Sequence, residues 1–115
     1  MTRVMIVDDE PGLLEILERA LRRSGYDVTT HGSGADAVLD MVDGRLPDVL
    51  VTDVRMPMVG GVELLDYVRD RHPALPVIVI TGHRTTSSMR GVPVLEKPFA
   101  MSTLIEQIER VAPRA

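Results

Sequence analysis

The sequence has 115 residues, with 13 basic and 17 acidic side chains, 44% hydrophobic residues and no cysteine. This length fits a single domain over residues 1–115, and the missing cysteines exclude disulfides and thiolate metal sites. The slight acidic excess disfavours direct nucleic-acid binding, which needs clustered Lys and Arg, and no apolar run approaches the roughly 20 residues that span a membrane.

The first part of the chain alternates between strand and helix patterns. A β-branched run, Val4–Val7, predicts a strand. Apolar residues at i, i+3 and i+4 spacing between Leu13 and Leu21 then predict an amphipathic helix, which Gly25 is well placed to end. The next run, Tyr26–His31, is more polar, and we expect it to form a strand at an edge of the sheet.

The middle of the chain repeats this order. A helix pattern from Ala37 to Val42 precedes a nearly continuous apolar run, Val49–Val51. A third helix pattern runs from Val62 to Val68, and the run Val77–Ile80 predicts the next strand. Continuous apolar runs of this kind are typical of parallel strands that are covered on both faces.

The last part of the chain adds one more strand and one more helix. The strand is predicted at Val92–Leu95 and the helix at Leu104–Val111, with Ser102 as a candidate cap near its start. Strands and helices that alternate throughout predict βαβ units with right-handed crossovers. We therefore expect a doubly wound α/β fold, a five-stranded parallel sheet with helices on both faces, whose ligands bind beyond the carboxyl ends of the strands.

Polar side chains follow four of the five predicted strands. In chain order they are Asp8, Asp9, Glu10, Asp53, Thr81 and Lys97. Carboxylates gathered at one edge of a sheet repel one another unless a cation is present, and Mg²⁺ prefers such oxygen ligands. The metal, the Lys97 ammonium and the Thr81 hydroxyl would suit a phosphoryl group, with a carboxylate as its nucleophile.

Each of these residues alone has an ordinary structural explanation. Asp8 or Asp9 could cap the helix that opens near Pro11, a threonine after an apolar strand is commonly structural, and a lysine before proline is usually solvated. Their joint placement at the ends of four strands favours a functional site.

Four short motifs contain these strand ends. They are VMIVDDEP from Val4, DVRMP from Asp53 with Gly60-Gly61 beyond it, VITG from Val79 and LEKPF from Leu95. With the motifs in this order, the chain resembles the CheY-like receiver domain of two-component response regulators over essentially its whole length. The resemblance implies the strand order 2-1-3-4-5 of that family.

The resemblance implies a role for each acidic residue. Asp53 would accept a phosphoryl group from a phosphohistidine on a sensor histidine kinase or phosphotransfer protein. Asp9, Asp53 and the backbone carbonyl of Arg55 would bind Mg²⁺ directly, with Mn²⁺ as an alternative metal, and Asp8 would act mainly through water.

The resemblance also implies how the other site residues act. Lys97 would pair with the phosphoryl oxygens, Thr81 would move toward the phosphoryl group, and the Lys97–Pro98 bond is similar to one that is cis in the family. Such a domain is a switch that catalyses only its own phosphorylation and dephosphorylation. It signals to a downstream protein through protein contacts. Because no signal-peptide pattern opens the chain, we expect it in the cytoplasm, without contacts to membranes or nucleic acid.

Two features depart from the family pattern. Only ten residues separate Thr81 from Val92, whereas a parallel crossover needs a dozen or more, and the glycine, serine and threonine residues among them are poor helix formers. We therefore predict that the fourth helix is absent or about one turn long. Val94 stands where similar receivers often carry Tyr or Phe, and valine is stiff and too short for the usual rotamer change.

The short connection suggests two hypotheses. The polar segment Gly82–Gly91 is either the switch itself, ordering when Asp53 is phosphorylated, or a plain connector. The missing helix would also leave apolar sheet surface near Val92 and Val94. This surface suits homodimerisation or partner docking through the face of the fourth helix, the fifth strand and the last helix.

Three other functions fit parts of the sequence. A metal-dependent phosphatase with an Asp nucleophile needs a second acid two residues later, where this chain has Arg55. A flavodoxin-type cofactor domain needs a Gly/Ser/Thr-rich loop after the first strand, and none is present. A degenerate receiver, acting as a phosphorylation-independent interaction or dimerisation module, remains the alternative. The chain fits a stand-alone receiver and a piece of a longer regulator or hybrid kinase equally well.

Overall fold

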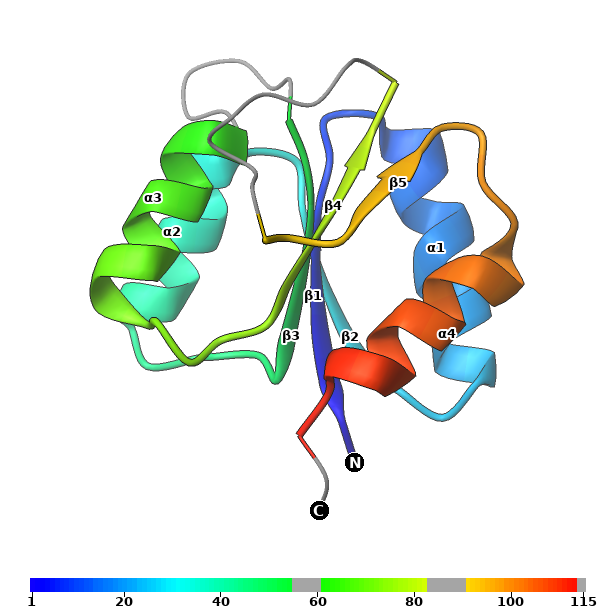
Figure 1. The fold of residues 1–115 in the computed structure, drawn as a ribbon, viewed down its shortest axis with the longest axis horizontal. Coiled ribbons are helices and arrows are strands. Elements are labelled where there is room, and N and C mark those ends of the chain that lie inside the picture. Colours follow the sequence, from blue (N-terminus) through cyan, green and yellow to red (C-terminus); the bar gives the residue numbers. More distant parts are fainter. Residues whose placement is uncertain (55–60, 83–90, 114–115) are drawn as a thin grey trace.

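The computed structural model of the protein describes residues 1–54, 61–82 and 91–113. Within these ranges five parallel strands form one sheet in the order β2-β1-β3-β4-β5 (Figure 1). The strands are β1 (Arg3–Val7), β2 (Asp27–His31), β3 (Val49–Asp53), β4 (Val77–Thr81) and β5 (Val94–Glu96). The predicted strand order and the edge position of the second strand are confirmed.

Helices cover both faces of the sheet. α2 (Gly34–Val42) and α3 (Gly61–Arg71) lie on one face, and α1 (Pro11–Arg23) and α4 (Met101–Val111) lie on the other (Figure 1). The central strands β1, β3 and β4 are therefore buried almost throughout. The predicted doubly wound α/β fold is confirmed.

Alternate residues of β1 enter two separate apolar cores, because successive strand side chains point to opposite faces of a sheet. Val4 and Ile6 belong to the core under α1 and α4, which includes Leu104. Met5 and Val7 belong to the core under α2 and α3. Both faces need apolar residues, so the strand reads as a continuous apolar run in the sequence.

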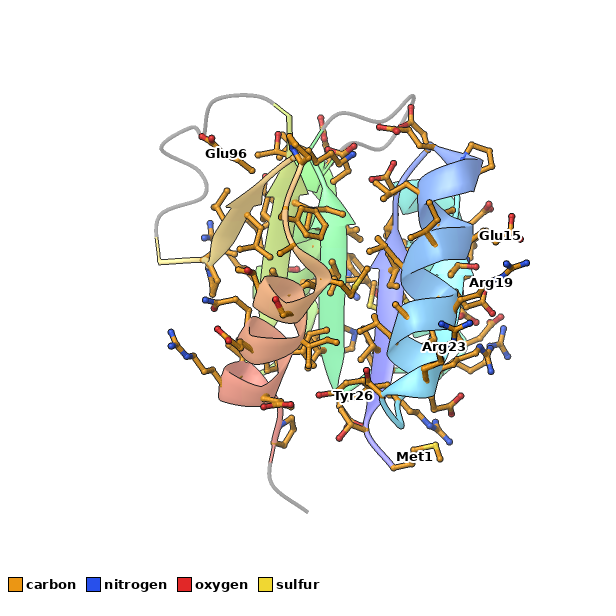
Figure 2. All side chains as sticks on the ribbon, turned by 90° about the vertical axis from the view of Figure 1, so that its right-hand side faces the viewer. Met1, Glu15, Arg19, Arg23, Tyr26 and Glu96 are labelled. Carbon is orange, nitrogen blue, oxygen red and sulfur yellow. The ribbon has the colours of Figure 1, made fainter. Side chains whose placement is uncertain are left out.

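Helix α1 is amphipathic in the way that its sequence predicts. Leu17 and Leu21 are buried against the sheet. Glu15 and Arg19 lie on the outer side of the helix, where their side chains form an ion pair at 2.6 Å (Figure 2). Gly25, just beyond the helix, has a φ of +94°, which favours glycine. It ends the helix as predicted.

The connection between β4 and β5 holds no helix in the part that the structure describes. This agrees with the predicted loss or shortening of the fourth helix. Residues 83–90, on which the hypothesis of a switch segment at Gly82–Gly91 depends, lie outside the described residues. That hypothesis stays a prediction.

The start of β5 was predicted two residues too early. The strand begins at Val94 and not at Val92. Pro93, directly before the strand, has no N–H to donate to a neighbouring strand, although its carbonyl oxygen accepts a hydrogen bond from the N–H of Val79 at 2.9 Å. The proline therefore delays the start of the strand.

Two other boundaries also differ from the prediction. Helix α4 begins at Met101 with Ala100 as its N-cap, and no side chain caps it. Ser102 lies within the first turn, so its assignment as a cap was wrong. Strand β2 begins one residue after Tyr26, whose N–H instead donates to the carbonyl of Leu21 at the end of α1, at 3.1 Å.

Candidate functional site

Four strands bring polar residues to one edge of the sheet. β1 leads into Asp8, and β3 and β4 end at Asp53 and Thr81, the polar residues expected at the ends of these two strands. Lys97 directly follows β5, and its backbone N–H donates to the carbonyl of Thr81 at 2.7 Å. Because the strands are parallel, these four residues lie at the same edge, the upper one in Figure 1.

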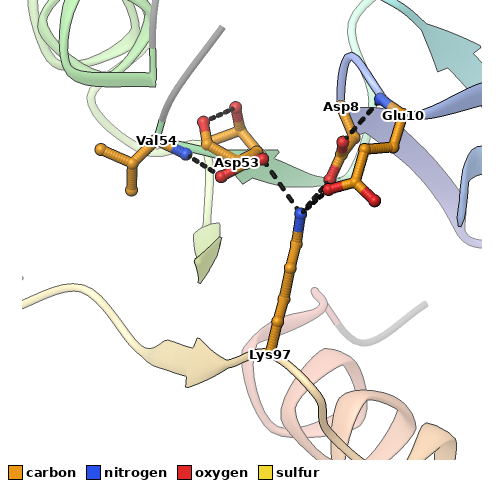
Figure 3. A network of polar contacts seen from close by, with 6 residues as sticks. Asp8, Glu10, Asp53, Val54 and Lys97 are labelled. Atoms are coloured by element: carbon orange, nitrogen blue, oxygen red, sulfur yellow. Dashed lines mark hydrogen bonds and ion pairs between the residues drawn. The ribbon is translucent and has the colours of Figure 1, made fainter. Parts of the chain in front are cut away.

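The side chain of Lys97 joins three carboxylates from two parts of the chain. Its Nζ atom donates to Oδ2 of Asp8 at 2.8 Å, to Oδ2 of Asp53 at 3.0 Å and to Oε1 of Glu10 at 3.1 Å (Figure 3). An ammonium group has three donors. All three are therefore used.

The two aspartates are buried and fixed by backbone N–H groups. Asp8 is inaccessible to solvent and Asp53 is 5% exposed. Oδ1 of Asp8 accepts from the N–H of Glu10 at 2.9 Å, and Oδ1 of Asp53 accepts from the N–H of Val54 at 2.6 Å. Each carboxylate is thus held at one oxygen by the backbone, while its other oxygen faces Lys97.

The pKa values of Asp8 and Lys97 both follow from this arrangement. Burial raises the pKa of Asp8, and the opposing hydrogen bonds from Lys97 and the backbone only partly offset it. Burial alone would lower the pKa of Lys97, but its hydrogen bonds to Asp8, Asp53 and Glu10 outweigh burial and raise it. Lys97 is therefore a permanent cation at neutral pH.

Glu10 belongs to the site, although the motifs assigned this residue no role. It is the third acidic residue of an uninterrupted run, which is the sequence signal for it. Glu10 is also the N-cap residue of α1, but its side chain makes no capping hydrogen bond. The possibility that Asp9 caps this helix was therefore wrong. The side chain of Glu10 is 62% exposed, in contrast to the buried aspartates.

The described residues fit a divalent cation. The carboxylates of Asp8, Glu10 and Asp53 each offer one oxygen, and these oxygens all lie within 4.8 Å of one another. One ammonium faces these three carboxylates, so the site keeps an excess of negative charge. Oxygen donors with excess negative charge are the environment that Mg²⁺ prefers.

The remaining predicted site residues lie as follows. Asp9 is exposed and does not belong to this group of converging carboxylates. Thr81 is buried and follows Ile80, which pairs with Asp53 across β3 and β4. Arg55 lies outside the described residues. The direct metal contacts of Asp9 and Arg55, and the water-mediated one of Asp8, stay predictions.

Two features of the segment around β5 bear on the family resemblance. The Lys97–Pro98 peptide bond is cis, as the resemblance implied. Val94, at the position of the usual aromatic residue, is half-buried and packs against the core under α2 and α3.

Comparison with known proteins decides the family. Residues 4–109 match the model of the response regulator receiver domain. The chain belongs to this family. Receiver domains are parts of two-component systems, and both phosphorylation and Mg²⁺ binding are typical of them.

The chain is similar to part of a longer protein and to solved chains of nearly its own length. The transcriptional regulator NtrC of Escherichia coli is 38% identical over an alignment of 113 residues, and the match covers 93% of this chain and 24% of NtrC. The chain thus spans about a quarter of the length of that relative. The crystal structure of the response regulator TrrA from Thermotoga maritima, 27% identical, matches with a TM-score of 0.89 over 96% of this chain and 99% of TrrA. CheY4 of Vibrio cholerae, 28% identical, matches with a TM-score of 0.88 over 96% and 98% of the two chains.

Among the residues that the structure describes, no helix has the length and apolar character needed to cross a membrane. The cytoplasmic location expected from the sequence stays a prediction.

Proposed function

We propose that this receiver domain is a phosphorylation-dependent switch in which Asp53 accepts a phosphoryl group. The observation that carries the proposal is the Lys97 ammonium, which bridges the buried carboxylates of Asp8 and Asp53 at 2.8 and 3.0 Å. A cation held at this distance from a carboxylate nucleophile is suited to neutralise the charge of a phosphoryl group.

In the proposed reaction, an oxygen of Asp53 forms a bond to phosphorus. The bond between phosphorus and the histidine nitrogen of the donor breaks, and its electron pair stays on that nitrogen. The N–H of Val54 and the Nζ of Lys97 orient the attacking carboxylate, at 2.6 and 3.0 Å. Lys97 then pairs with the phosphoryl oxygens. No separate substrate is turned over, so the domain is no enzyme beyond its own phosphorylation and dephosphorylation.

Mg²⁺, or Mn²⁺ in its place, would neutralise the phosphoryl oxygens during the transfer. The residues proposed to hold it are Asp8, Asp9, Asp53 and the carbonyl of Arg55. Two observations support a divalent metal: the converging carboxylate oxygens of this chain, and the complex of TrrA with Mg²⁺ and BeF.

The proposed phosphodonor is a sensor histidine kinase or a phosphotransfer protein, and the proposed receiver of the signal is a downstream protein. The family membership and the similarity to NtrC support both. The alternative is a degenerate receiver that works without phosphorylation. The intact contacts among Asp8, Asp53 and Lys97 favour the first function over this alternative.

Incubation with acetyl phosphate and Mg²⁺, followed by intact-mass measurement, tests the proposal. Acetyl phosphate supplies the phosphoryl group without a partner protein. We expect one phosphoryl adduct in the wild type and none in Asp53→Asn or after chelation of the metal. Asp66→Asn, which changes an exposed aspartate on α3, is the matched control and should be labelled like the wild type. Equal labelling of Asp53→Asn would contradict the assignment.

We also propose that the face beside β5, over which the described residues place no helix, supports homodimerisation. A groove of about 420 Å³ lies between the end of α3, the segment before β5 and the end of α4, and its apolar lining includes Val68, Val92 and Val111. Val92, in the lining of the groove, is half-buried, as is Val94 in β5. A second copy of the chain would remove this apolar surface from water.

A further inference from the structure

We propose that Glu10 is a positioning residue for Lys97: it occupies the third donor of the ammonium in the resting site and releases it when a phosphoryl group arrives on Asp53. This inference rests on the proposed function and adds a residue that the family motifs left without a role. It follows from the number of donors on Lys97, from the burial of its partners and from the backbone of Glu10.

The donors of Lys97 are all taken in the resting site. Asp8, Asp53 and Glu10 accept one hydrogen bond each, at 2.8, 3.0 and 3.1 Å. An ammonium has no fourth hydrogen to offer. Lys97 can therefore donate to a phosphoryl oxygen only after its hydrogen bond to one of these three carboxylates breaks.

The burial of the three carboxylates decides which hydrogen bond to Lys97 breaks. The side chain of Asp8 is fully buried and that of Asp53 is 7% exposed, whereas that of Glu10 is 62% exposed. Separating Lys97 from Asp8, or from Asp53 while it is still a carboxylate, would leave a buried charge without its partner, which is costly. Water can replace Lys97 at the exposed carboxylate of Glu10 at little cost. Glu10, which also makes the longest of the three contacts, is the partner that can be exchanged.

The backbone of Glu10 makes this exchange possible without disturbing the site. Its N–H donates to Oδ1 of Asp8 at 2.9 Å, and this contact does not involve the side chain. The carboxylate of Glu10 can thus leave Lys97 while the residue keeps Asp8 oriented. Substitutions of the Glu10 side chain should accordingly change the exchange and leave the fold intact.

The kinetic test uses three variants that separate the effect of side-chain length at position 10 from the effect of its charge. Glu10→Ala removes the carboxylate, Glu10→Asp keeps its charge but shortens the side chain by one methylene, and Glu10→Gln keeps an acceptor oxygen at the same reach. Glu106→Gln, at an exposed position on α4, is the matched control. The rate of Asp53 labelling is measured by intact mass as a function of acetyl phosphate concentration, at saturating Mg²⁺.

We expect the half-saturating acetyl phosphate concentration to fall roughly two- to fivefold in Glu10→Ala and Glu10→Asp, the range of an exposed ion pair. Glu10→Gln should lie between these variants and the wild type, and the control should match the wild type. A Glu10→Asp variant that behaves like the wild type would overturn the inference, because charge alone would then account for the effect. Equal half-saturation in all variants would overturn it as well.

A second measurement observes Lys97 directly. Lys97 is the only lysine of the chain, so its ammonium gives one side-chain lysine signal in ¹⁵N-labelled protein. Without a phosphodonor, its hydrogens should exchange with water roughly two- to fivefold faster in Glu10→Ala than in the wild type. With beryllofluoride and Mg²⁺ bound, the two proteins should exchange alike. A difference that persists in the bound state would overturn the release step.

The two measurements also separate this inference from the function on which it rests. A wild type that takes no phosphoryl group at Asp53 would overturn the proposed function and, with it, the inference. A wild type that is labelled, with Glu10 variants that match it in both measurements, would overturn the inference alone.

Discussion

Lys97 is the only lysine among 13 basic residues, and every other one is an arginine. A lysine ammonium is a compact charge with three rotatable donors, whereas an arginine guanidinium is a planar fork. Three carboxylate oxygens converge on the Nζ of Lys97 within 3.1 Å. The compact group suits this arrangement, which explains a lysine at this position in an otherwise arginine-rich chain.

The sequence predicts only some of the acidic residues that contact Lys97. Asp8 and Asp53 were predicted because they follow apolar strands, and the parallel sheet brings such positions to one edge. The choice between Asp9 and Glu10 depends on how the chain turns from β1 into α1. That turn leaves Asp9 exposed and directs the Glu10 side chain to Lys97. No residue pattern in the sequence indicates this direction.

Metal removal is expected to lower the stability of the domain. Mg²⁺ binds the folded site and not the unfolded chain, so a free concentration of ten times its Kd adds about 1.4 kcal/mol to the free energy of unfolding. For a domain of this size the midpoint of thermal unfolding should rise by roughly 5 °C. Calorimetry with Mg²⁺ and with a chelator measures the difference. Asp8→Asn should lose most of the rise and Asp66→Asn should keep it; an equal rise in both would contradict the site.

At the scale of elements, helices with one clear apolar stripe were predicted well. In α1, Leu17 and Leu21 face the core, and Gly25 ends the helix through its backbone conformation. The short elements near the carboxyl end of the chain were predicted less well. β5 has three residues and begins after Pro93, and α4 begins at Met101, after an N-cap residue, Ala100, whose side chain makes no capping hydrogen bond. Their boundaries depend on tertiary contacts that leave no local sequence signal.

The packing of α4 on the sheet gives a prediction for stability. Leu104 is fully buried in the core under α1 and α4. Leu104→Ala should lower the free energy of unfolding by about 2–5 kcal/mol, because it removes buried methyl groups and leaves a cavity. Leu39→Ala, on the exposed side of α2, where the leucine is 63% exposed, should change it by less than about 0.5 kcal/mol. Urea unfolding of both variants makes the comparison, and equal losses would contradict the assigned packing.

At the scale of the whole molecule, the sheet brings together residues that are far apart in the chain. Lys97 contacts Asp8 across 89 positions and Asp53 across 44 positions. The alternation of strands and helices was enough to predict this meeting, because it fixes a parallel sheet with one carboxyl edge. The same alternation, interrupted between Thr81 and Val92, also indicated the shortened connection before β5.

The face beside β5 leads to a prediction about assembly. With beryllofluoride and Mg²⁺, light scattering after size exclusion should give a dimer of twice the 12.7 kDa of one chain at high protein concentration. Val92→Asp places a charge in the apolar groove and should return the protein to a monomer. Leu39→Asp, at an exposed apolar residue of α2, is the control and should stay dimeric. A wild type that remains monomeric at every concentration would contradict the dimer.

The central claim is that Asp53 is the residue that carries the phosphoryl group. Reduction of the acetyl phosphate-treated protein with borohydride converts an aspartyl phosphate into homoserine, and peptide mass spectrometry then locates the changed residue. We predict homoserine at position 53 and unchanged aspartate at positions 8 and 9. Homoserine at position 8 or 9, or a phosphoryl adduct that borohydride does not convert, would contradict the account.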